Sequence, residues 1–268
     1  MANTIFYILT YFVIYSFLGW VLESVVRTIC EKKIINTGFL IGPFCPIYGF
    51  GAIIMVLFLD NFKNNIIILF LISFIVLSIW EYIVGVLLEK LFKTKYWDYS
   101  KLKFNIQGRV CLKNSLYWGI LGVLLIYIIQ PVINNFTDMI PHDILVYVDV
   151  ILMIAILVDT VITIFRIMFI DKKIRQVLEI GETIKEKIAE LKNSEIMEKA
   201  HIDNLQKLIS DLKVKQDILK IKIYKRVIRL KKSFPEMNSE NLTKFMTQKI
   251  SLEGIKEKIK KHKGKKSS

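Results

Sequence analysis

The chain has 268 residues, of which 53% are hydrophobic and 23% are charged, and its formal net charge is +14. The hydrophobic residues lie in long runs, which excludes an ordinary soluble protein with one buried core and indicates membrane-spanning helices. The charge is uneven, because residues 171–268 contain 26 Lys and Arg against 14 Asp and Glu, a net charge of +12. We therefore expect an all-α protein with a transmembrane domain over residues 1–170 and a basic helical tail over residues 171–268.

Five apolar segments are long enough to be interpreted as transmembrane helices. They cover about residues 4–29, 39–59, 66–88, 112–130 and 144–170. Asp60–Asn65 is a short polar turn. We expect Pro131–Asp143 to be a loop, because Pro131 and Pro141 break helices at its two ends.

The Lys and Arg residues predict the orientation of these five spans. The turn after the first span contains Lys32 and Lys33, and residues 90–113 contain seven basic residues. In contrast, Lys63 is the one basic residue of the second turn, and Pro131–Asp143 contains none. Basic loops face the cytoplasm, so we expect the N-terminus outside the membrane and the tail in the cytoplasm.

Ionisable residues inside the spans predict a functional site near the cytoplasmic side. Glu23 and Arg27 share one face of the first span, and Glu81 lies well inside the third. A charge near the centre of a span costs about 2.5–3.5 kcal/mol on insertion scales, so Glu81 needs a cationic partner, a water-filled cavity or a neutral form. Arg27 or Arg109 could be that partner. The predicted polar cluster contains Trp20, Glu23, Arg27, Glu81, Asp98, Arg109 and Asn114.

Some residues near this predicted site also have a simpler interpretation. Glu23 and Arg27 could form an ordinary ion pair on a helix face, with Arg27 reaching toward lipid phosphates. The segment GFLIGPFCPIYGFG, residues 38–51, could be a routine helix start with small residues for close packing. Alternatively, it is a re-entrant or broken element that lines a cavity, as in transporters. Trp97 and Tyr99 are typical interfacial anchors.

Motifs for metal binding and nucleotide hydrolysis are missing from the sequence. Cys30, Cys45 and Cys111 fall at one expected depth, but there is no CxxC pair and no nearby histidine, so we predict no metal site and no cofactor. There is also no Gly-rich P-loop and no GxSxG motif. We therefore do not expect this chain to hydrolyse ATP, and the sequence leaves other catalysis open.

The tail has apolar residues at alternating steps of four and three, which is typical of a coiled-coil seam. The seam contains Ile184, Ile188, Leu191, Ile202, Leu205, Ile209, Leu212, Leu219, Ile223 and Leu230. We expect a coiled coil over about residues 177–230, and the polar stretch Asn193–Glu198 allows either one long helix or an antiparallel hairpin. Pro235 ends this element, and Ser239 could cap a short helix over about residues 239–261.

The basic tail and its seam suggest particular partners. Lys and Arg near a membrane attract anionic lipid headgroups, and association through the seam would produce a homo-oligomer. Nucleic acid is not expected, because aromatic residues are not interleaved with the basic ones.

Several motifs in a fixed order resemble a known family. They are FLGWVLES, NTGFLIGPFCPIYGFGA, EYIVGVLLEKLF, YWDYS and NIQGRVCLKNSLYWGILG. Together they are similar to bacterial membrane proteins classed as ABC-transporter permeases of the CmpB type, over about residues 10–130. The resemblance implies a multi-pass protein of the bacterial cytoplasmic membrane that works with a separate ATPase subunit. Five spans are few for half of a permease, so such a chain would have to dimerise.

The sequence leaves three functions open. The leading one is a membrane-embedded transport component with a polar site at the cytoplasmic leaflet, whose substrate the sequence does not identify. The second is an intramembrane enzyme acting on lipid headgroups, in which an arginine holds phosphate and a carboxyl group acts as general base. The third is a non-catalytic scaffold that recruits partners through the tail.

Overall fold

The computed structural model describes residues 2–32, 34, 37–192 and 199–247. Within these residues the chain is helical apart from one pair of short strands. It divides into two compact units, the first formed by Met1–Phe165 with Lys232–Met237 and the second by Arg166–Lys231 with Asn238–Ser268.

Long apolar helices dominate the first unit. They are α1 (Ala2–Glu31), α3 (Ile66–Phe92), α4 (Leu112–Leu124) with its helical continuation to Asp138, and the N-terminal half of α6 (His142–Lys192). In the described part of the chain, four helical stretches are long and apolar enough to cross a membrane. The remaining predicted span, the second in chain order (residues 39–59), corresponds to α2 (Pro46–Leu59), which has 14 residues. At 1.5 Å per residue α2 is about 21 Å long, less than the ~30 Å hydrocarbon core of a bilayer.

The prediction that the second helix begins at residue 39 is wrong, because irregular backbone precedes α2 up to Pro46. Gly38 has a φ of +112°, which glycine adopts at low cost, and Pro43 and Pro46 have no N–H for a helical hydrogen bond. The segment is partly covered by protein, since Leu40 and Cys45 are each 3% exposed whereas Pro43 is exposed. Irregular backbone at membrane depth is tolerated in such a setting, which agrees with the re-entrant interpretation.

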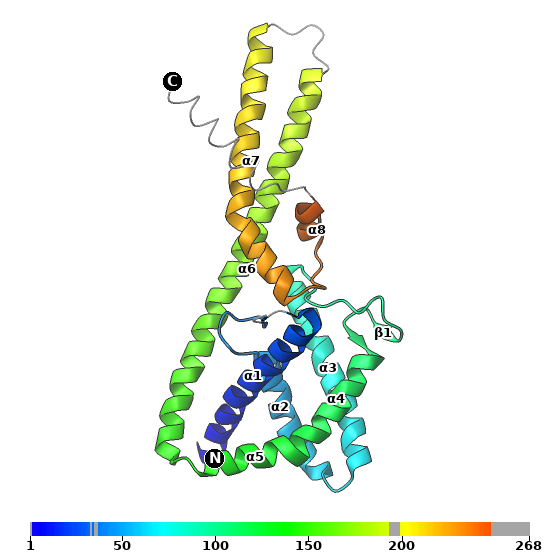
Figure 1. Ribbon diagram of the computed structural model, residues 1–268, viewed down its shortest axis with the longest axis vertical. Helices are drawn as coiled ribbons and strands as arrows, with labels where there is room; N and C mark the ends of the chain where they lie inside the picture. The colour runs from blue at the N-terminus through cyan, green and yellow to red at the C-terminus, as the bar shows by residue number, and fades with distance from the viewer. Residues whose placement is uncertain (1, 33, 35–36, 193–198, 248–268) are drawn as a thin grey trace. The chain divides into compact units, whose positions relative to one another are not determined.

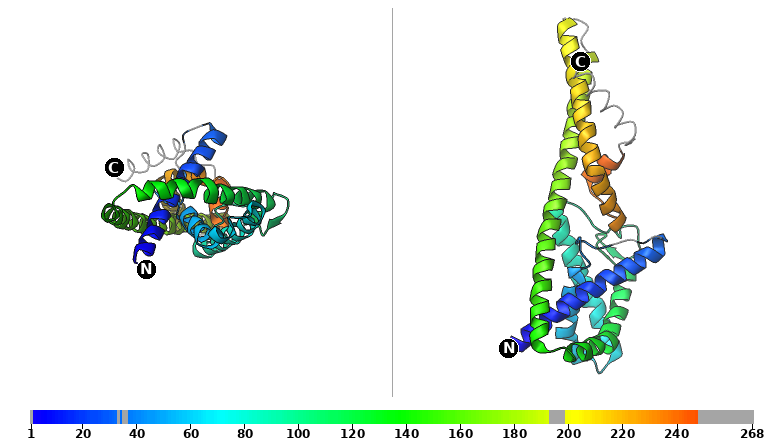
Figure 2. Two further views of the ribbon diagram at one scale, coloured as in Figure 1. Left: turned by 90° about the horizontal axis from the view of Figure 1, so that it is seen from below. Right: turned by 60° about the vertical axis from the view of Figure 1, so that its left-hand side comes forward.

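Helices α3 and α4 form a closely packed antiparallel pair (Figures 1 and 2). Asn65 caps α3, because its side-chain oxygen accepts hydrogen bonds from the backbone N–H groups of Ile67 and Ile68. The connection to α4 contains an antiparallel pair that the sequence did not predict, β1 (Asn105–Ile106) and β2 (Val110–Cys111).

A π-helical turn, η2 (Leu125–Ile129), joins α4 to α5 (Gln130–Asp138). The prediction of a loop from Pro131 is therefore wrong for residues 131–138. Pro131 lies in the first turn of α5, where its missing N–H costs least, and α5 turns away from the direction of α4 (Figure 1). A π-turn next to a proline is a recognised cause of such a change in direction.

The ends of these helices gather at two opposite sides of the first unit. The C-terminal end of α1 and the β1–β2 pair lie at one end, whereas the start of α1, the 3₁₀ turn η1 (Asp60–Phe62) and the α5–α6 connection lie at the other (Figures 1 and 2). Helix α2 leads directly into η1 at the second of these ends, and the irregular residues 37–45 precede it. The C-terminal end of α1 and the basic connection from α3 to α4 thus share one end of this unit.

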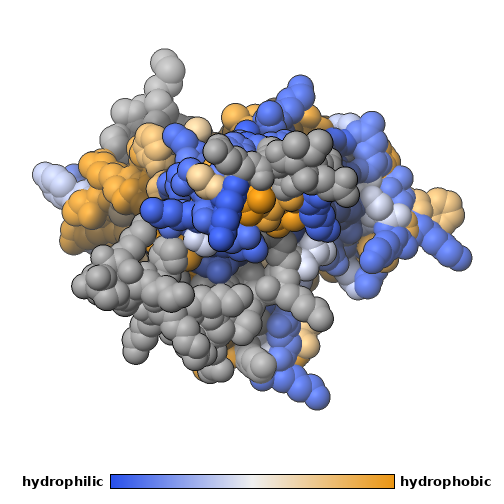
Figure 3. Space-filling model, turned by 90° about the horizontal axis from the view of Figure 1, so that it is seen from above, coloured by the Kyte–Doolittle hydropathy of each residue, from blue (hydrophilic) through white to orange (hydrophobic). Residues whose placement is uncertain are grey.

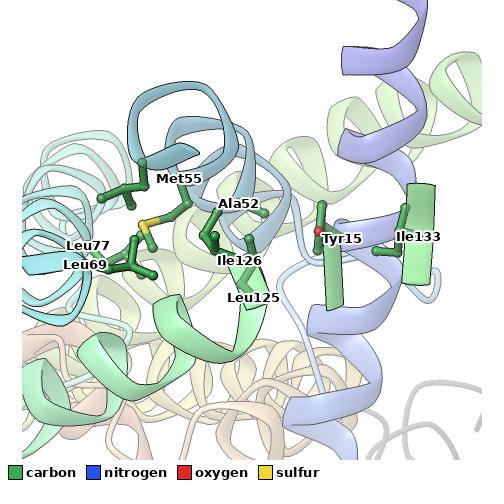
Figure 4. Packing of buried hydrophobic residues seen from close by; sticks show 9 residues of the cluster. Tyr15, Ala52, Met55, Leu69, Leu77, Leu125, Ile126 and Ile133 are labelled. Atoms are coloured by element: carbon green, nitrogen blue, oxygen red, sulfur yellow. The ribbon is translucent and has the colours of Figure 1, made fainter. Parts of the chain in front are cut away.

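A buried hydrophobic cluster holds together the helices from α1 through α5. Figure 4 shows its members Tyr15, Ala52, Met55, Leu69, Leu77, Leu125, Ile126 and Ile133. Lipid is as apolar as these side chains, so close van der Waals packing rather than removal from water stabilises them in a membrane. A second cluster, formed by Phe12, Val13, Leu40 and Ile156, attaches α6 to α1 and to the segment before α2.

The second unit is an antiparallel helical hairpin, in which α7 (Lys199–Ser233) pairs with the C-terminal half of α6. The side-chain amide of Gln216 donates to the carbonyl oxygen of Val177 at 2.9 Å, and the guanidinium group of Arg226 lies 5.6 Å from the centre of the Phe169 ring. These contacts exclude the alternative of one long helix. The polar stretch 193–198 lies outside the described residues.

Several seam residues are buried in this hairpin, namely Ile184, Leu205, Ile209 and Ile223. Helix α8 (Glu240–Thr247) follows, and the backbone N–H of Leu242 donates to Ser239 Oγ at 3.1 Å, which confirms the predicted cap. The rest of the predicted helix, residues 248–261, lies outside the described part of the chain. Hydrophilic side chains cover much of the described surface in the view from above (Figure 3).

Candidate functional site

Glu81 of α3 is a buried carboxyl group, 4% exposed, held by neutral donors. Trp118 Nε1 donates to Glu81 Oε2 at 2.9 Å, and the Tyr99 hydroxyl donates to Oε1 at 3.2 Å. The side chain of Asn114 also hydrogen-bonds to Glu81. No ion pair within the described residues involves Glu81. Arg109, one of its predicted partners, binds Glu89 instead, at 2.6 Å.

Tyr99 contributes to this site rather than acting only as an interfacial anchor. It lies outside the helices, in the connection between α3 and α4, where its backbone N–H donates to the carbonyl oxygen of Gly108 at 2.7 Å. Burial and the adjacent Glu81 raise the pKa of the Tyr99 phenol above its ordinary value of 10.0. The phenol therefore stays protonated at neutral pH and can donate to Glu81.

Glu23 of α1 faces the segment that leads into α2. Cys45 Sγ donates to Glu23 Oε2 at 3.7 Å, and the Tyr48 hydroxyl forms a second hydrogen bond to Glu23. Arg27 interacts electrostatically with Glu23, as expected for residues on one helix face. The backbone N–H of Cys45 donates to the carbonyl oxygen of Ser16 at 2.8 Å, which fixes the thiol close to α1.

The surroundings of Glu23 and Glu81 meet at an aromatic contact. The rings of Tyr48 and Trp118 have centroids 5.9 Å apart, so the hydrogen-bond partner of one carboxyl group touches the partner of the other. We name this group of side chains the carboxyl cluster, consisting of Glu23, Cys45, Tyr48, Glu81, Tyr99, Asn114 and Trp118.

Arg109 and Asp98, although predicted as site residues, bind partners outside the carboxyl cluster. Trp20, in contrast, borders the cluster, since a Cβ atom at Gly38 would meet Cys45 Sγ at 3.3 Å and Trp20 Cδ1 at 3.4 Å. Arg109 binds Glu89 and lies 5.5 Å from the centre of the Tyr82 ring. Asp98 accepts hydrogen bonds from the backbone N–H and hydroxyl of Ser100, at 3.1 and 2.5 Å, which lower the pKa of its carboxyl group below 3.8. It therefore stabilises a turn. The ring of Trp20 packs against Phe17, with centroids 5.8 Å apart.

A cavity of about 1020 Å³ borders the carboxyl cluster within the first unit. Tyr48, Glu81 and Trp118 contribute to its wall, and the remaining lining is almost entirely apolar side chains of α1 to α6. Trp80 is held at this wall because its indole N–H donates to the carbonyl oxygen of Ile47 at 3.0 Å. The site thus combines a few directed polar groups with a large apolar volume, which is the usual composition of a small-molecule site.

Asp159 of α6 holds the irregular segment that carries Cys45. Its carboxylate accepts hydrogen bonds from the backbone N–H groups of Gly42 at 2.7 Å and Ile41 at 3.2 Å. The hydroxyl of Thr163 donates to the same carboxylate at 3.3 Å, so the two residues share a face of α6. Because these amides have no helical partner, the carboxylate supplies the acceptor that buried backbone requires.

Comparison with known families decides the classification. The family model described as "Putative ABC-transporter type IV" matches residues 10–164, which is more than half of the chain. The chain belongs to this family. No curated protein and no solved structure matches it.

The ABC-transporter type IV match covers more than the motifs suggested. It continues past residue 130 through α5 and into α6, and it includes Asp159 and every residue of the carboxyl cluster. Helices α7 and α8 lie beyond it. Together with the four apolar helices long enough to span a bilayer, the match identifies a membrane protein.

Sequence reasoning did not assign Cys45, Tyr48, Tyr99 and Trp118 to the site, and Tyr48 and Trp118 lie inside helices. Within apolar runs an aromatic residue resembles any other packing residue. Trp118 did have a detectable signal, since it lies one helical turn after Asn114 and so shares the face of a predicted site residue.

Proposed function

We propose that this chain is the membrane-spanning component of an ABC-type transporter and that the carboxyl cluster is part of its substrate site. The observation that carries the proposal is Glu81, a carboxyl group that is 4% exposed, borders a cavity and is held by neutral donors. Ionisable groups at such positions are costly and mark substrate or ion pathways. The sequence has no P-loop, so ATP hydrolysis would come from a separate subunit.

The proposal is tested first by purifying the tagged full-length chain in mild detergent and identifying the proteins bound to it. We expect a stoichiometric ATPase subunit. A chain that is recovered alone, or only with itself, would contradict the transporter assignment.

Glu81→Gln then tests the site, because glutamine keeps the size of the side chain and removes its ability to ionise. We expect this variant to retain the ATPase subunit but to fail to complement a strain that lacks the protein. Glu31→Gln, at an exposed glutamate of α1, is the matched control and should restore it. Full complementation by Glu81→Gln would remove Glu81 from the site.

The geometry gives less support to an enzyme that acts on lipid headgroups. That function needs an arginine free to hold a phosphate, whereas Arg109 binds Glu89 and Arg27 interacts with Glu23. A changed lipid composition in a deletion strain would nevertheless favour it over transport. The scaffold alternative predicts that removal of residues 172–268 abolishes function even though the carboxyl cluster is intact.

We further propose that the N-terminus faces outward, and that the basic tail lies in the cytoplasm and contacts anionic lipid. The distribution of Lys and Arg between the loops supports this orientation. The bacterial cytoplasmic membrane is the location implied by the family, and dimerisation would complete a permease.

A further inference from the structure

The cavity beside the carboxyl cluster opens sideways between α1 and the η2–α5 region. On one side its lining includes Phe17, Leu22 and Val25 of α1, which are 42%, 42% and 50% exposed. On the other side it includes Ile128 and Val132, which are 56% and 63% exposed. These residues belong to helical stretches apolar enough to cross a membrane, so this opening meets lipid rather than water. We name the feature the lateral groove.

The dimensions of the lateral groove match the hydrocarbon of one membrane leaflet. Its lining on α1 extends from Val13 to Val25, which corresponds to about 18 Å at a rise of 1.5 Å per residue. One leaflet contributes about 15 Å to a hydrocarbon core of ~30 Å. A groove of this length, with apolar walls, is suited to an extended hydrocarbon tail and would leave a water-soluble substrate poorly solvated.

The polar part of the groove favours a cationic headgroup. Glu81 is the charged residue in the lining, and its oxygens accept from the neutral side chains of Tyr99, Asn114 and Trp118. A carboxylate has about four acceptor positions, so capacity for a further donor remains. An ammonium group would supply that donor as a charge-assisted hydrogen bond, whereas an anionic headgroup would meet only repulsion from the carboxylate.

We propose that the lateral groove binds a membrane amphiphile with a hydrocarbon tail and a protonated amine in its headgroup, the tail lying along α1 and the amine bonding to Glu81. This inference rests on the proposed function, because it names the substrate class of the same site. It differs from lipid binding by the basic tail, which would select anionic headgroups and would not involve Glu81.

The test is a lipid titration of the purified full-length chain in detergent, with bound lipids counted by native mass spectrometry. Phosphatidylethanolamine, whose headgroup carries an amine, is compared with phosphatidylglycerol of the same acyl chains. We expect phosphatidylethanolamine to bind at least about tenfold more tightly, because a hydrogen bond to a charged group has about that effect on an equilibrium constant. Glu81→Gln should abolish this preference, whereas Glu31→Gln should retain it.

Val21→Phe and Val26→Phe separate the groove from the rest of the helix surface. Val21 lines the groove and Val26 does not, although Val26 is 49% exposed. We expect Val21→Phe to weaken binding of phosphatidylethanolamine about tenfold, by filling the space for its tail, and Val26→Phe to leave it unchanged. The melting temperature of each variant checks that it is folded.

Three results would overturn the proposal. They are equal binding of the two lipids by the unmodified chain, an unchanged preference in Glu81→Gln, and unchanged binding in Val21→Phe. Recovery of a lipid-free dimer that Val21→Phe dissociates and Val26→Phe does not would also overturn it, because a second copy would then occupy the groove. These measurements need neither the ATPase subunit nor transport. A Glu81→Gln variant that loses function but keeps the lipid preference would thus contradict this inference and leave the proposed function standing.

Discussion

At the scale of single residues, the hydrogen bonds to Glu81 give the first prediction. Tyr99→Phe removes the donor to Glu81 Oε1 and leaves that buried oxygen with one donor fewer. We expect a loss of about 1–3 kcal/mol in the free energy of unfolding, measured as a lower melting temperature in detergent. Tyr82→Phe is the control, because its hydroxyl donates to Gln107 at the exposed surface, and we expect an effect within about 0.5 kcal/mol. Equal effects of the two changes would contradict the role assigned to Tyr99.

Asp159 gives the second prediction, which concerns the irregular segment before α2. Asp159→Asn replaces one acceptor oxygen by an NH₂ group facing the backbone N–H groups of Ile41 and Gly42. We expect the segment to open more often and Cys45, now 3% exposed, to react about tenfold faster with a thiol reagent, as a change of about 1.4 kcal/mol implies. The measurement uses a chain in which Cys45 is the sole cysteine. Asp143→Asn, at an exposed residue of the same helix, should leave the rate unchanged.

Part of the carboxyl cluster could be predicted from the sequence, because ionisable residues in apolar runs are conspicuous. Glu23 and Glu81 were found in this way. Their partners Tyr48 and Trp118 were not, since an aromatic side chain in a span looks the same whether it packs or donates a hydrogen bond. Arg109 was assigned to the cluster from its expected depth, but depth does not determine which nearby carboxylate an arginine binds.

At the scale of helices, two glycines differ in what surrounds them and give a matched prediction. A Cβ atom at Gly122 of α4 would lie 2.3 Å from Ser73 Oγ and 2.4 Å from Met55 Cε, whereas one at Gly51 of α2 would meet Leu77 Cδ2 at an ordinary 3.5 Å. We expect Gly122→Ala to force α3 and α4 apart and to cost about 1–3 kcal/mol of stability. Gly51→Ala should be neutral or stabilise α2 by up to about 1 kcal/mol. Thermal unfolding in detergent compares them, and an equal loss in both would show that helix approach is not the cause.

The ends of the helices were predicted well where apolar runs and caps determine them. They were predicted poorly next to proline residues. The start of α3 at residue 66 was correct, since Asn65 marks it with a cap. Pro131 was taken to end a helix, but the π-turn before it lets the chain continue through α5. Pro46 begins α2 later than hydropathy suggested, because Asp159, which is remote in sequence, satisfies the irregular backbone in front of it. A distant acceptor of this kind leaves no local pattern in the sequence.

At the scale of the whole molecule, basic residues occur in two places, the short loops of the first unit and the helical tail. Residues 93–113, which include the connection from α3 to α4, contain six basic residues, whereas Lys63 is the one basic residue of the turn at the opposite end, a difference that can set orientation. Many basic residues of the described tail lie on the α6–α7 hairpin, in which the seam residues Ile184, Leu205, Ile209 and Ile223 are buried. Hydropathy predicted the division into an apolar part and a basic helical part, but the choice between a hairpin and one long helix required contacts between residues such as Val177 and Gln216.

The number of membrane crossings gives the last prediction, because α2 is shorter than a bilayer core and yet leads into η1, at the end of the first unit opposite the C-terminal end of α1. If α2 crosses, three crossings separate Cys30 from residue 139, and the two lie on opposite sides. The basic loops then place Cys30, which is exposed, in the cytoplasm. We expect a membrane-impermeant maleimide to label Cys30 only after cells are opened, in a chain where it is the sole cysteine. Met139, which is 80% exposed, is changed to cysteine in a cysteine-free chain, and we expect the reagent to label this cysteine in intact cells.

Labelling of both sites from one side would mean that α2 enters and leaves by the same face, and the prediction of five spans would then be wrong. Opposite sides with Cys30 outside would instead reverse the orientation and place the tail outside the cell.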